Sequence, residues 1–209
     1  MKKRDFLKSA IALSTVFALP KFAAARSLTS GNGSNEMTQV IRKIKDNSRQ
    51  SVRLSNQFDF KKTYTEKLIP MSCLIAMHGR PGYLTQMASM GGNIASISLD
   101  GFSAIKAALL RGSLSITEEA INLGCPMNVR GHQSEIICAV IGGNEECLDL
   151  TLSHALPSDD DIYKSLLINK PRAAESLYRL SANPTRTRNT ILRMASDSPQ
   201  IITTINSWQ

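Results

Sequence analysis

Four cysteines and three histidines are the residues of this 209-residue sequence with the most potential for covalent or metal chemistry. Cys125 or Cys138 could act as a nucleophile if His132 served as its base, because a thiol needs a nearby proton acceptor. Neither cysteine lies in a nucleophile motif, and no third group is evident to orient the histidine. Zinc binding requires clustered ligands at a recognised spacing, which these residues lack. The sequence therefore predicts no catalytic residue, no metal site and no cofactor.

The first 25 residues have the pattern of a bacterial signal peptide. Lys2, Lys3 and Arg4 precede an apolar run over 10–19, and three alanines at 23–25 predict cleavage after Ala25. The apolar run is too short to span a bilayer comfortably, so no stable membrane insertion is expected after cleavage. The stretch 3–8 (KRDFLK) resembles the twin-arginine export signal but has Lys3 in place of the first arginine. General secretion is the alternative route, and the periplasm or the outside of the cell is the expected destination.

The four cysteines also allow a disulfide interpretation, because their number is even and an exported chain would enter an oxidising compartment. The best candidate pair is Cys138 with Cys147, since these residues would lie on two successive antiparallel helices. The alternative is that all four cysteines are free and buried.

Other polar residues have structural interpretations. His78 and His154 fall at predicted helix ends, where a donor near free carbonyl groups is common. The run of three aspartates at 159–161 favours a helix N-terminus. A calcium loop is not expected there, because its glycine and its distal glutamate are missing.

Basic residues cluster near both ends of the chain. The leader carries five basic residues and one acidic residue, so it accounts for +4 of the formal net charge of +8 and leaves +4 for the remainder. This modest charge favours solvated end caps and no nucleic-acid partner, with a basic surface that binds anionic lipid or nucleic acid as an alternative. The two clusters are Arg42, Lys43, Lys45, Arg49, Arg53, Lys61 and Lys62, and then Arg172, Arg179, Arg186 and Arg193.

Glycines recur at a fixed spacing in the middle of the chain. Gly79 and Gly112 are 33 residues apart, and so are Gly91 and Gly124. Each block between them contains two short apolar segments separated by a glycine-containing turn. A single helical hairpin of this kind cannot bury its apolar face alone, so the pattern predicts hairpins stacked side by side.

The block 100–128 resembles the ankyrin repeat, whose pattern runs D-G-x-T-P-L-H-x-A-A-x-x-G before a second helix that ends in Gly and is followed by Asn. Asp100 and Gly101 supply the turn, Ser103 replaces the Thr, and Gly112 closes the first helix. The second helix and its end match at Ile116, Ala120, Ile121, Gly124 and Asn128. The resemblance is weaker over 131–155 and 70–98.

The resemblance implies an all-α fold, a short α-solenoid of stacked helical hairpins with about three ankyrin-like repeats and helical caps. After the signal peptide (1–25), we expect a flexible linker over 26–36 and an N-terminal helical cap over 37–66, made of helices at 37–46 and 50–56. The ankyrin-like repeats then cover 67–155. Plain helical hairpins, with proline in the first turn of each second helix, cover 156–209.

The resemblance also implies protein–protein recognition, through the turn tips and the concave face of the first helices. The partner is expected to be another protein, which the sequence does not identify, and an enzyme with a non-obvious site is an alternative function. Phe102 is the best single contact, because an aromatic residue in a turn has no obvious core to fill, although packing between turns is the alternative. The expected contact residues are Ser98, Asp100, Phe102, Arg130, His132 and Gln133.

Overall fold

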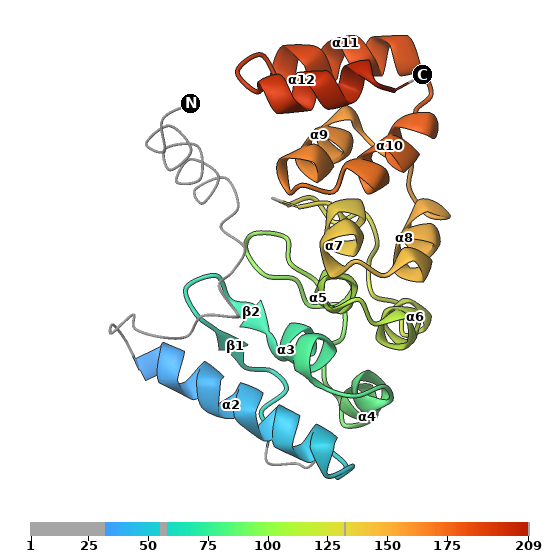
Figure 1. The fold of residues 1–209 in the computed structure, drawn as a ribbon. Coiled ribbons are helices and arrows are strands. Elements are labelled where there is room, and N and C mark those ends of the chain that lie inside the picture. The colour runs from blue at the N-terminus through green and yellow to red at the C-terminus, as the bar shows by residue number, and fades with distance from the viewer. Residues whose placement is uncertain (1–31, 55–57, 132, 209) are drawn as a thin grey trace. The chain divides into compact units, whose positions relative to one another are not determined.

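The computed structural model describes residues 32–54, 58–131 and 133–208. The expected signal peptide, its cleavage site at Ala25 and linker residues 26–31 lie outside this part of the chain. The described residues form eleven helices and one antiparallel pair of two-residue strands (Figure 1). The elements are α2 (Asn32–Arg49), β1 (Thr63–Tyr64), β2 (Ile69–Pro70), α3 (Met71–His78), α4 (Tyr83–Ser89), α5 (Ala104–Arg111), α6 (Leu114–Asn122), α7 (Glu135–Gly142), α8 (Glu145–Leu152), α9 (Asp159–Leu167), α10 (Pro171–Arg179), α11 (Pro184–Met194) and α12 (Pro199–Asn206).

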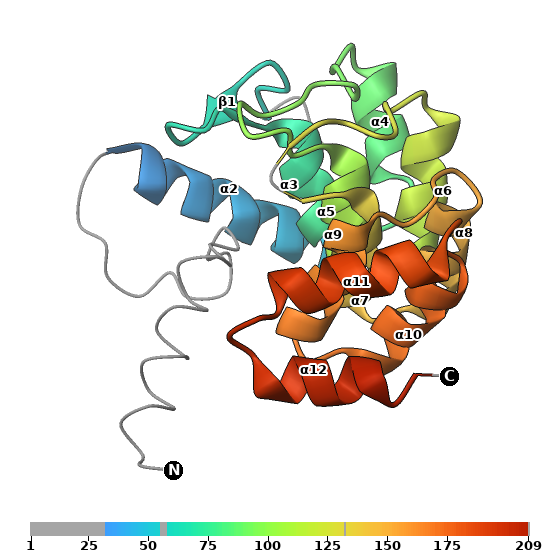
Figure 2. The same ribbon diagram turned by 90° about the horizontal axis from the view of Figure 1, so that it is seen from above.

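Ten of these helices form five hairpins that stack in sequence order. The first helices of the hairpins make an inner row, in which α3 packs on α5, α5 on α7 and α7 on α9. The second helices α4, α6 and α8 make an outer row beside it (Figure 1). At the C-terminal end, α11 and α12 lie side by side, as Figure 2 shows. The predicted stack of helical hairpins is confirmed.

Small residues allow the inner helices to approach closely. Ala104, Ala107 and Ala108 of α5 are fully buried, and Ala139 of α7 is only 1% exposed. Such contacts bury apolar surface between neighbouring repeats, which is the main stabilising term in a solenoid. The last hairpins share a second apolar cluster, in which the buried Trp208 ring lies 5.0 Å from the Tyr178 ring.

Helix starts and ends follow the sequence signals. The side chain of Ser103 caps α5, and Ser158 with Asp161 forms a capping box at the start of α9, so the aspartate run is a helix N-terminus as predicted. Proline occupies the first turn of α10, α11 and α12. Gly112 and Gly143 end α5 and α7 in the left-handed conformation, with φ of 70° and 72°.

The N-terminal part differs from the prediction in two places. The expected linker is wrong over 32–36, because these residues already belong to α2, which also contains the predicted helix 37–46. The predicted helix at 50–56 is wrong over the described residues 50–54: Ser51 has a positive φ of 56°, and the Leu54 amide donates to the Gln86 side chain at 2.9 Å. The remaining described part of the expected helical cap, 58–66, is not helical either: it contains turns and strand β1, which pairs with β2 just beyond it. Strands of two residues are too short to show an alternating pattern in the sequence.

No helix of the described residues combines the length and the apolar character that a membrane crossing requires.

The two glycine caps give a matched stability test. A Cβ at Gly112 would lie 2.8 Å from the Gly142 carbonyl oxygen of the next hairpin, whereas a Cβ at Gly143 would meet nothing within 4 Å. We expect Gly143→Ala to lower the free energy of unfolding by about 1–2 kcal/mol because of its positive φ. Gly112→Ala should cost a further 1–3 kcal/mol, approximately, for the displaced neighbour. Urea unfolding measures both, and equal losses would contradict the close approach of the hairpins.

Candidate functional site

Three connections project from the same side of the inner row, and we call them the finger loops (Figure 1). The first is the β1–β2 hairpin, residues 63–70, which precedes α3. The second, residues 95–103, precedes α5, and the third, residues 126–134, precedes α7. Because each finger loop leads directly into an inner helix, the stacking of these helices brings the three loops together.

The second finger loop is a turn closed by Ser98. The Ser98 amide donates to the Phe102 carbonyl at 3.0 Å, and the Phe102 amide donates to the Ser98 hydroxyl oxygen at 2.9 Å. The Ser98 hydroxyl in turn donates to the Asp100 carboxylate. Ser98 is buried, so its side chain fixes the turn and is not presented at the surface.

The first and second finger loops are joined by a backbone and a side-chain contact. The Leu99 amide donates to the Lys67 carbonyl at 2.9 Å, and the Lys67 ammonium lies 3.1 Å from the Asp100 carboxylate. Partial burial by itself would raise the pKa of Asp100, but the hydrogen bonds from Ser98 and Lys67 outweigh it and lower this pKa below its ordinary value. Asp100 is therefore ionised at neutral pH and occupied with contacts inside the chain.

The second and third finger loops touch through their backbones. A Cβ at Gly101 would lie 2.1 Å from the Arg130 carbonyl oxygen, and a Cβ at Gly131 would lie 2.5 Å from the Asp100 carbonyl oxygen. Gly101 also has a positive φ of 77°. The two glycines allow a backbone approach that no other residue type permits at these positions.

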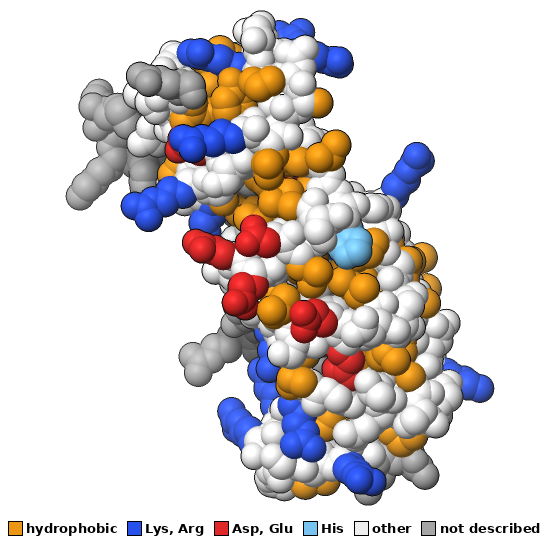
Figure 3. Space-filling view, turned by 90° about the vertical axis from the view of Figure 1, so that its right-hand side faces the viewer, with side chains coloured by type: hydrophobic (Ala, Val, Ile, Leu, Met, Phe, Trp, Pro, Cys, Tyr) orange, Lys and Arg blue, Asp and Glu red, His pale blue; other side chains and the backbone are white. Residues whose placement is uncertain are grey.

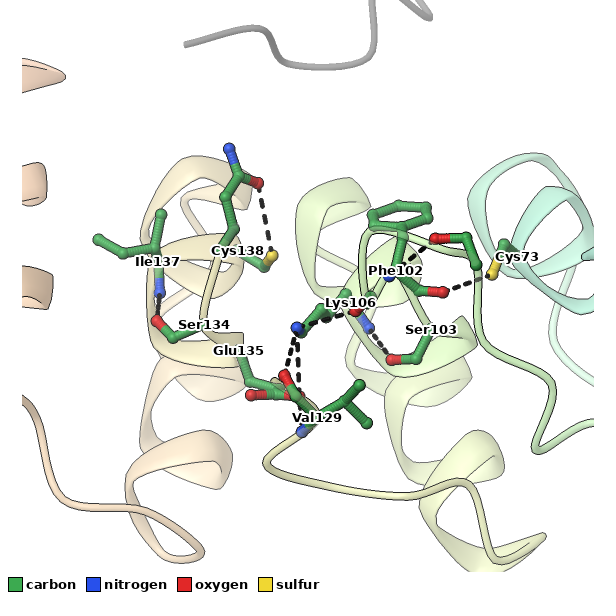
Figure 4. Close-up of polar contacts among 12 residues, drawn as sticks. Cys73, Phe102, Ser103, Lys106, Val129, Ser134, Glu135, Ile137 and Cys138 are labelled. Atoms are coloured by element: carbon green, nitrogen blue, oxygen red, sulfur yellow. Dashed lines mark hydrogen bonds and ion pairs between the residues drawn. The ribbon is translucent and has the colours of Figure 1, made fainter. Parts of the chain in front are cut away.

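A buried lysine bridges the second and third finger loops (Figure 4). Lys106 of α5 is only 1% exposed, and its ammonium donates to the Gly101 carbonyl at 2.9 Å and to the Val129 carbonyl at 2.7 Å. Its charge is balanced by Glu135, itself 4% exposed, whose carboxylate lies 3.9 Å away. The same carboxylate accepts a hydrogen bond from the Val129 amide at 3.2 Å.

The Lys106–Glu135 pair was not predicted from the sequence. The signal was present, because Lys106 is the only charged residue between Ala104 and Leu110. A lysine in such an apolar stretch is buried only when it has partners, and the partners here come from the loops on either side.

The structure separates the predicted contact residues into different environments. Ser98 is buried, Asp100 is partly buried, and Phe102 is half-buried with its carbonyl accepting from the Cys73 thiol at 3.6 Å. Arg130 is exposed at the tip of the third finger loop, while Gln133 is half-buried. His132 lies outside the described residues.

Two exposed leucines that sequence analysis did not single out lie at the tips. Leu99 is 73% exposed in the second finger loop, and Leu68 is 45% exposed in the first. Their neighbouring residues are joined by the contacts of Lys67 with Leu99 and Asp100, so both leucines belong to one surface. We call Leu68, Leu99 and Arg130 the tip surface.

The candidate Cys138–Cys147 disulfide is not formed in the structure, in which all four cysteines are free and buried. The two thiols face different neighbours: Cys138 donates to the Gln133 side chain at 3.9 Å, and Cys147 contacts Thr117 of α6. Burial raises the pKa of Cys125 and of Cys138 to about 12, so neither is a thiolate at neutral pH. Within the described ranges, no three His, Cys, Asp or Glu side chains gather in a way that could hold a metal ion.

Comparison with known proteins identifies the fold. A scan against models of protein families and a search of the curated proteins both give no match. Among solved structures, the crystal structure of the human ASB11 ankyrin repeat domain is similar, with a TM-score of 0.50 and 16% sequence identity over 74% of this chain and 71% of that chain. The chain therefore has the fold of an ankyrin repeat domain.

The Lys106–Glu135 pair leads to a stability prediction. Lys106→Met removes the donor for two loop carbonyls and leaves Glu135 without its cation, so we expect the free energy of unfolding to fall by about 3–5 kcal/mol. The double variant Lys106→Met/Glu135→Gln should lose clearly less than the sum of the two single losses, because it removes both charges. Chemical denaturation measures all three variants. Lys67→Met is the control, because the Lys67–Asp100 pair is more exposed; it should cost less than about 1 kcal/mol. Additive losses in the double variant would contradict a coupled Lys106–Glu135 pair.

Proposed function

We propose that the chain is a non-enzymatic binding module that recognises another protein through the tip surface of its finger loops. The observation that carries this proposal is the way the loops hold one another. The buried Lys106 ammonium donates to carbonyls of the second and third finger loops, and Lys67 pairs the first loop with the second. Gly101 allows the backbones of the second and third loops to make contact. Loops that are ordered before binding lose little entropy on association, which favours recognition.

The composition of the tip surface fits a protein partner. Leu99 supplies a large exposed apolar side chain, and Leu68 in the adjoining first finger loop supplies a second. Charged groups surround them, namely the half-exposed Lys67 and the exposed Arg130. An apolar core with a polar rim is the usual anatomy of a protein interface, and arginine is enriched there. Ser98 and Asp100 contribute by fixing the turn, and Phe102 by supporting it.

Partner capture tests this function. The purified chain, a Leu68→Ser/Leu99→Ser variant and a Leu156→Ser variant serve as matched baits. Leu156 is as exposed as Leu99, at 78%, but lies in the connection between α8 and α9, outside the finger loops. We expect one partner to be retained by the native chain and by Leu156→Ser, and its affinity for the tip variant to fall at least about tenfold, since losing two apolar contacts of about 1 kcal/mol each has that effect.

All three baits should melt at the same temperature, because the substituted leucines are exposed. Equal capture by the native chain and the tip variant would remove the tip surface from the proposed site.

We also propose that the chain is exported and that its partner lies in the periplasm or outside the cell. The pattern of residues 1–25 supports this, with its basic start, its apolar run and its alanines before the expected cleavage at Ala25. Mass spectrometry of the chain from fractionated bacterial cells should find an N-terminus at or near residue 26 outside the cytoplasm. Replacing Lys3 and Arg4 by Gln should retain the uncleaved chain inside the cell. An uncleaved native chain in the cytoplasm would contradict export.

A further inference from the structure

A second surface lies on the outer row, away from the finger loops. Between α8 and α10 the chain leaves a groove of about 650 Å³. Apolar side chains line much of it, including Leu148 and Leu152 of α8, Ala173 of α10 and Leu180 just after α10. Leu180 is 51% exposed, and Figure 3 shows hydrophobic side chains gathered on this outer face between acidic and basic groups.

The groove arises where the connections between hairpins change. The connections that enter α5 and α7 are 14 and 12 residues long, whereas the one that enters α9 has six. The outer helices α4, α6 and α8 pack on one another in order, but α10 packs on α9 and makes little contact with α8. Without a further helix between α8 and α10, the apolar sides of both remain partly open.

The two walls of the groove carry opposite charges. Glu145 and Asp149, one turn apart on α8, form an acidic wall, and Lys170 and Arg172 form a basic wall at the start of α10. All four side chains are exposed. The ion pairs found in the described part of the chain include none of these four residues. Their charges are therefore available to an incoming segment.

We propose that this groove binds a short amphipathic helix of a partner protein, with an apolar stripe flanked by a basic residue facing α8 and an acidic residue facing α10. The spacing on α8 favours a helix, because Glu145 with Asp149 and Leu148 with Leu152 each repeat after four residues and can interdigitate with side chains of the same spacing. Walls of opposite sign fix the direction in which the helix lies. This site goes beyond the proposed function and uses none of the tip-surface residues.

Synthetic peptides test the proposal directly on the full chain. Four 15-residue peptides share the same stripe of leucines and differ in the residues that flank it. The mixed peptide carries Lys on one flank and Glu on the other, and two single-sign peptides carry Lys on both flanks or Glu on both. The fourth has the mixed charges and a central proline. By fluorescence anisotropy, the mixed peptide should bind at least about tenfold more tightly than either single-sign peptide, a difference of about 1.4 kcal/mol. The proline peptide should not bind, because it cannot complete a helix.

Two variants of α8 locate the binding. Asp149→Lys should remove most of the preference for the mixed peptide over the peptide with Glu on both sides, because the new lysine offsets Glu145 and leaves the α8 wall without net charge. Glu146→Lys is the matched control: this residue is also exposed on α8 but does not line the groove, so the preference for the mixed peptide should remain. The Leu68→Ser/Leu99→Ser variant should bind the mixed peptide as the native chain does, which separates this test from that of the tip surface.

Three results would overturn the proposal. The first is equal affinity for all four peptides. The second is an unchanged preference in Asp149→Lys, or the same change in Glu146→Lys. The third is dimerisation of the free chain, measured by analytical ultracentrifugation, that is abolished by Asp149→Lys, because a second copy would then occupy the groove.

Discussion

The buried ammonium of Lys106 is the interaction on which the arrangement of the finger loops depends. Burying a lysine costs several kcal/mol unless its charge and its donors are satisfied. Here two carbonyls from different loops and one carboxylate do so together. Glu135 contributes from the first turn of α7, where the helix dipole also favours a negative charge. If either loop moved away, a buried donor would lose its acceptor, so the lysine penalises separation of the loops.

This link acts on top of the general rule for repeat proteins, in which each unit contacts only its neighbours. Apolar packing between α3, α5 and α7 aligns the hairpins, but it restrains the loops only through the ends of the helices. The polar contacts of Lys106, Lys67 and Ser98 extend that alignment to the tips. Past α8 the connections are short, and the polar contacts between hairpins are made by the start of α9, where Asp161 accepts from Ser134 and Asp159 accepts from Thr187. The outer row opens into a groove in the same region.

The sequence contained most of the fold and little of the site. Glycines 33 residues apart, serine and proline at helix starts, and apolar periodicity each act locally, so the hairpins could be predicted. The β1–β2 hairpin could not, because two-residue strands have no detectable period. The exposure of Leu99 could not be predicted either, because the sequence does not show whether a leucine in a turn faces a core or solvent. Ser98 and Asp100 were placed in the right loop, but Asp100 is turned toward Lys67, a residue more than 30 positions away that the sequence pattern does not connect to it.

The two proposed surfaces differ in what makes them available. At the tips, Ser98, Asp100 and Lys67 contact one another, and the leucines of the same loops are exposed with Arg130. On the outer face, charged groups are exposed because α10 packs on α9 and does not cover α8. The tip surface therefore suits an apolar side chain of a partner, whose contact does not depend strongly on orientation. The groove instead fixes the orientation of a bound segment through its charges. An ankyrin stack of this length can present both at once because its inner and outer rows are formed by different helices of the same hairpins.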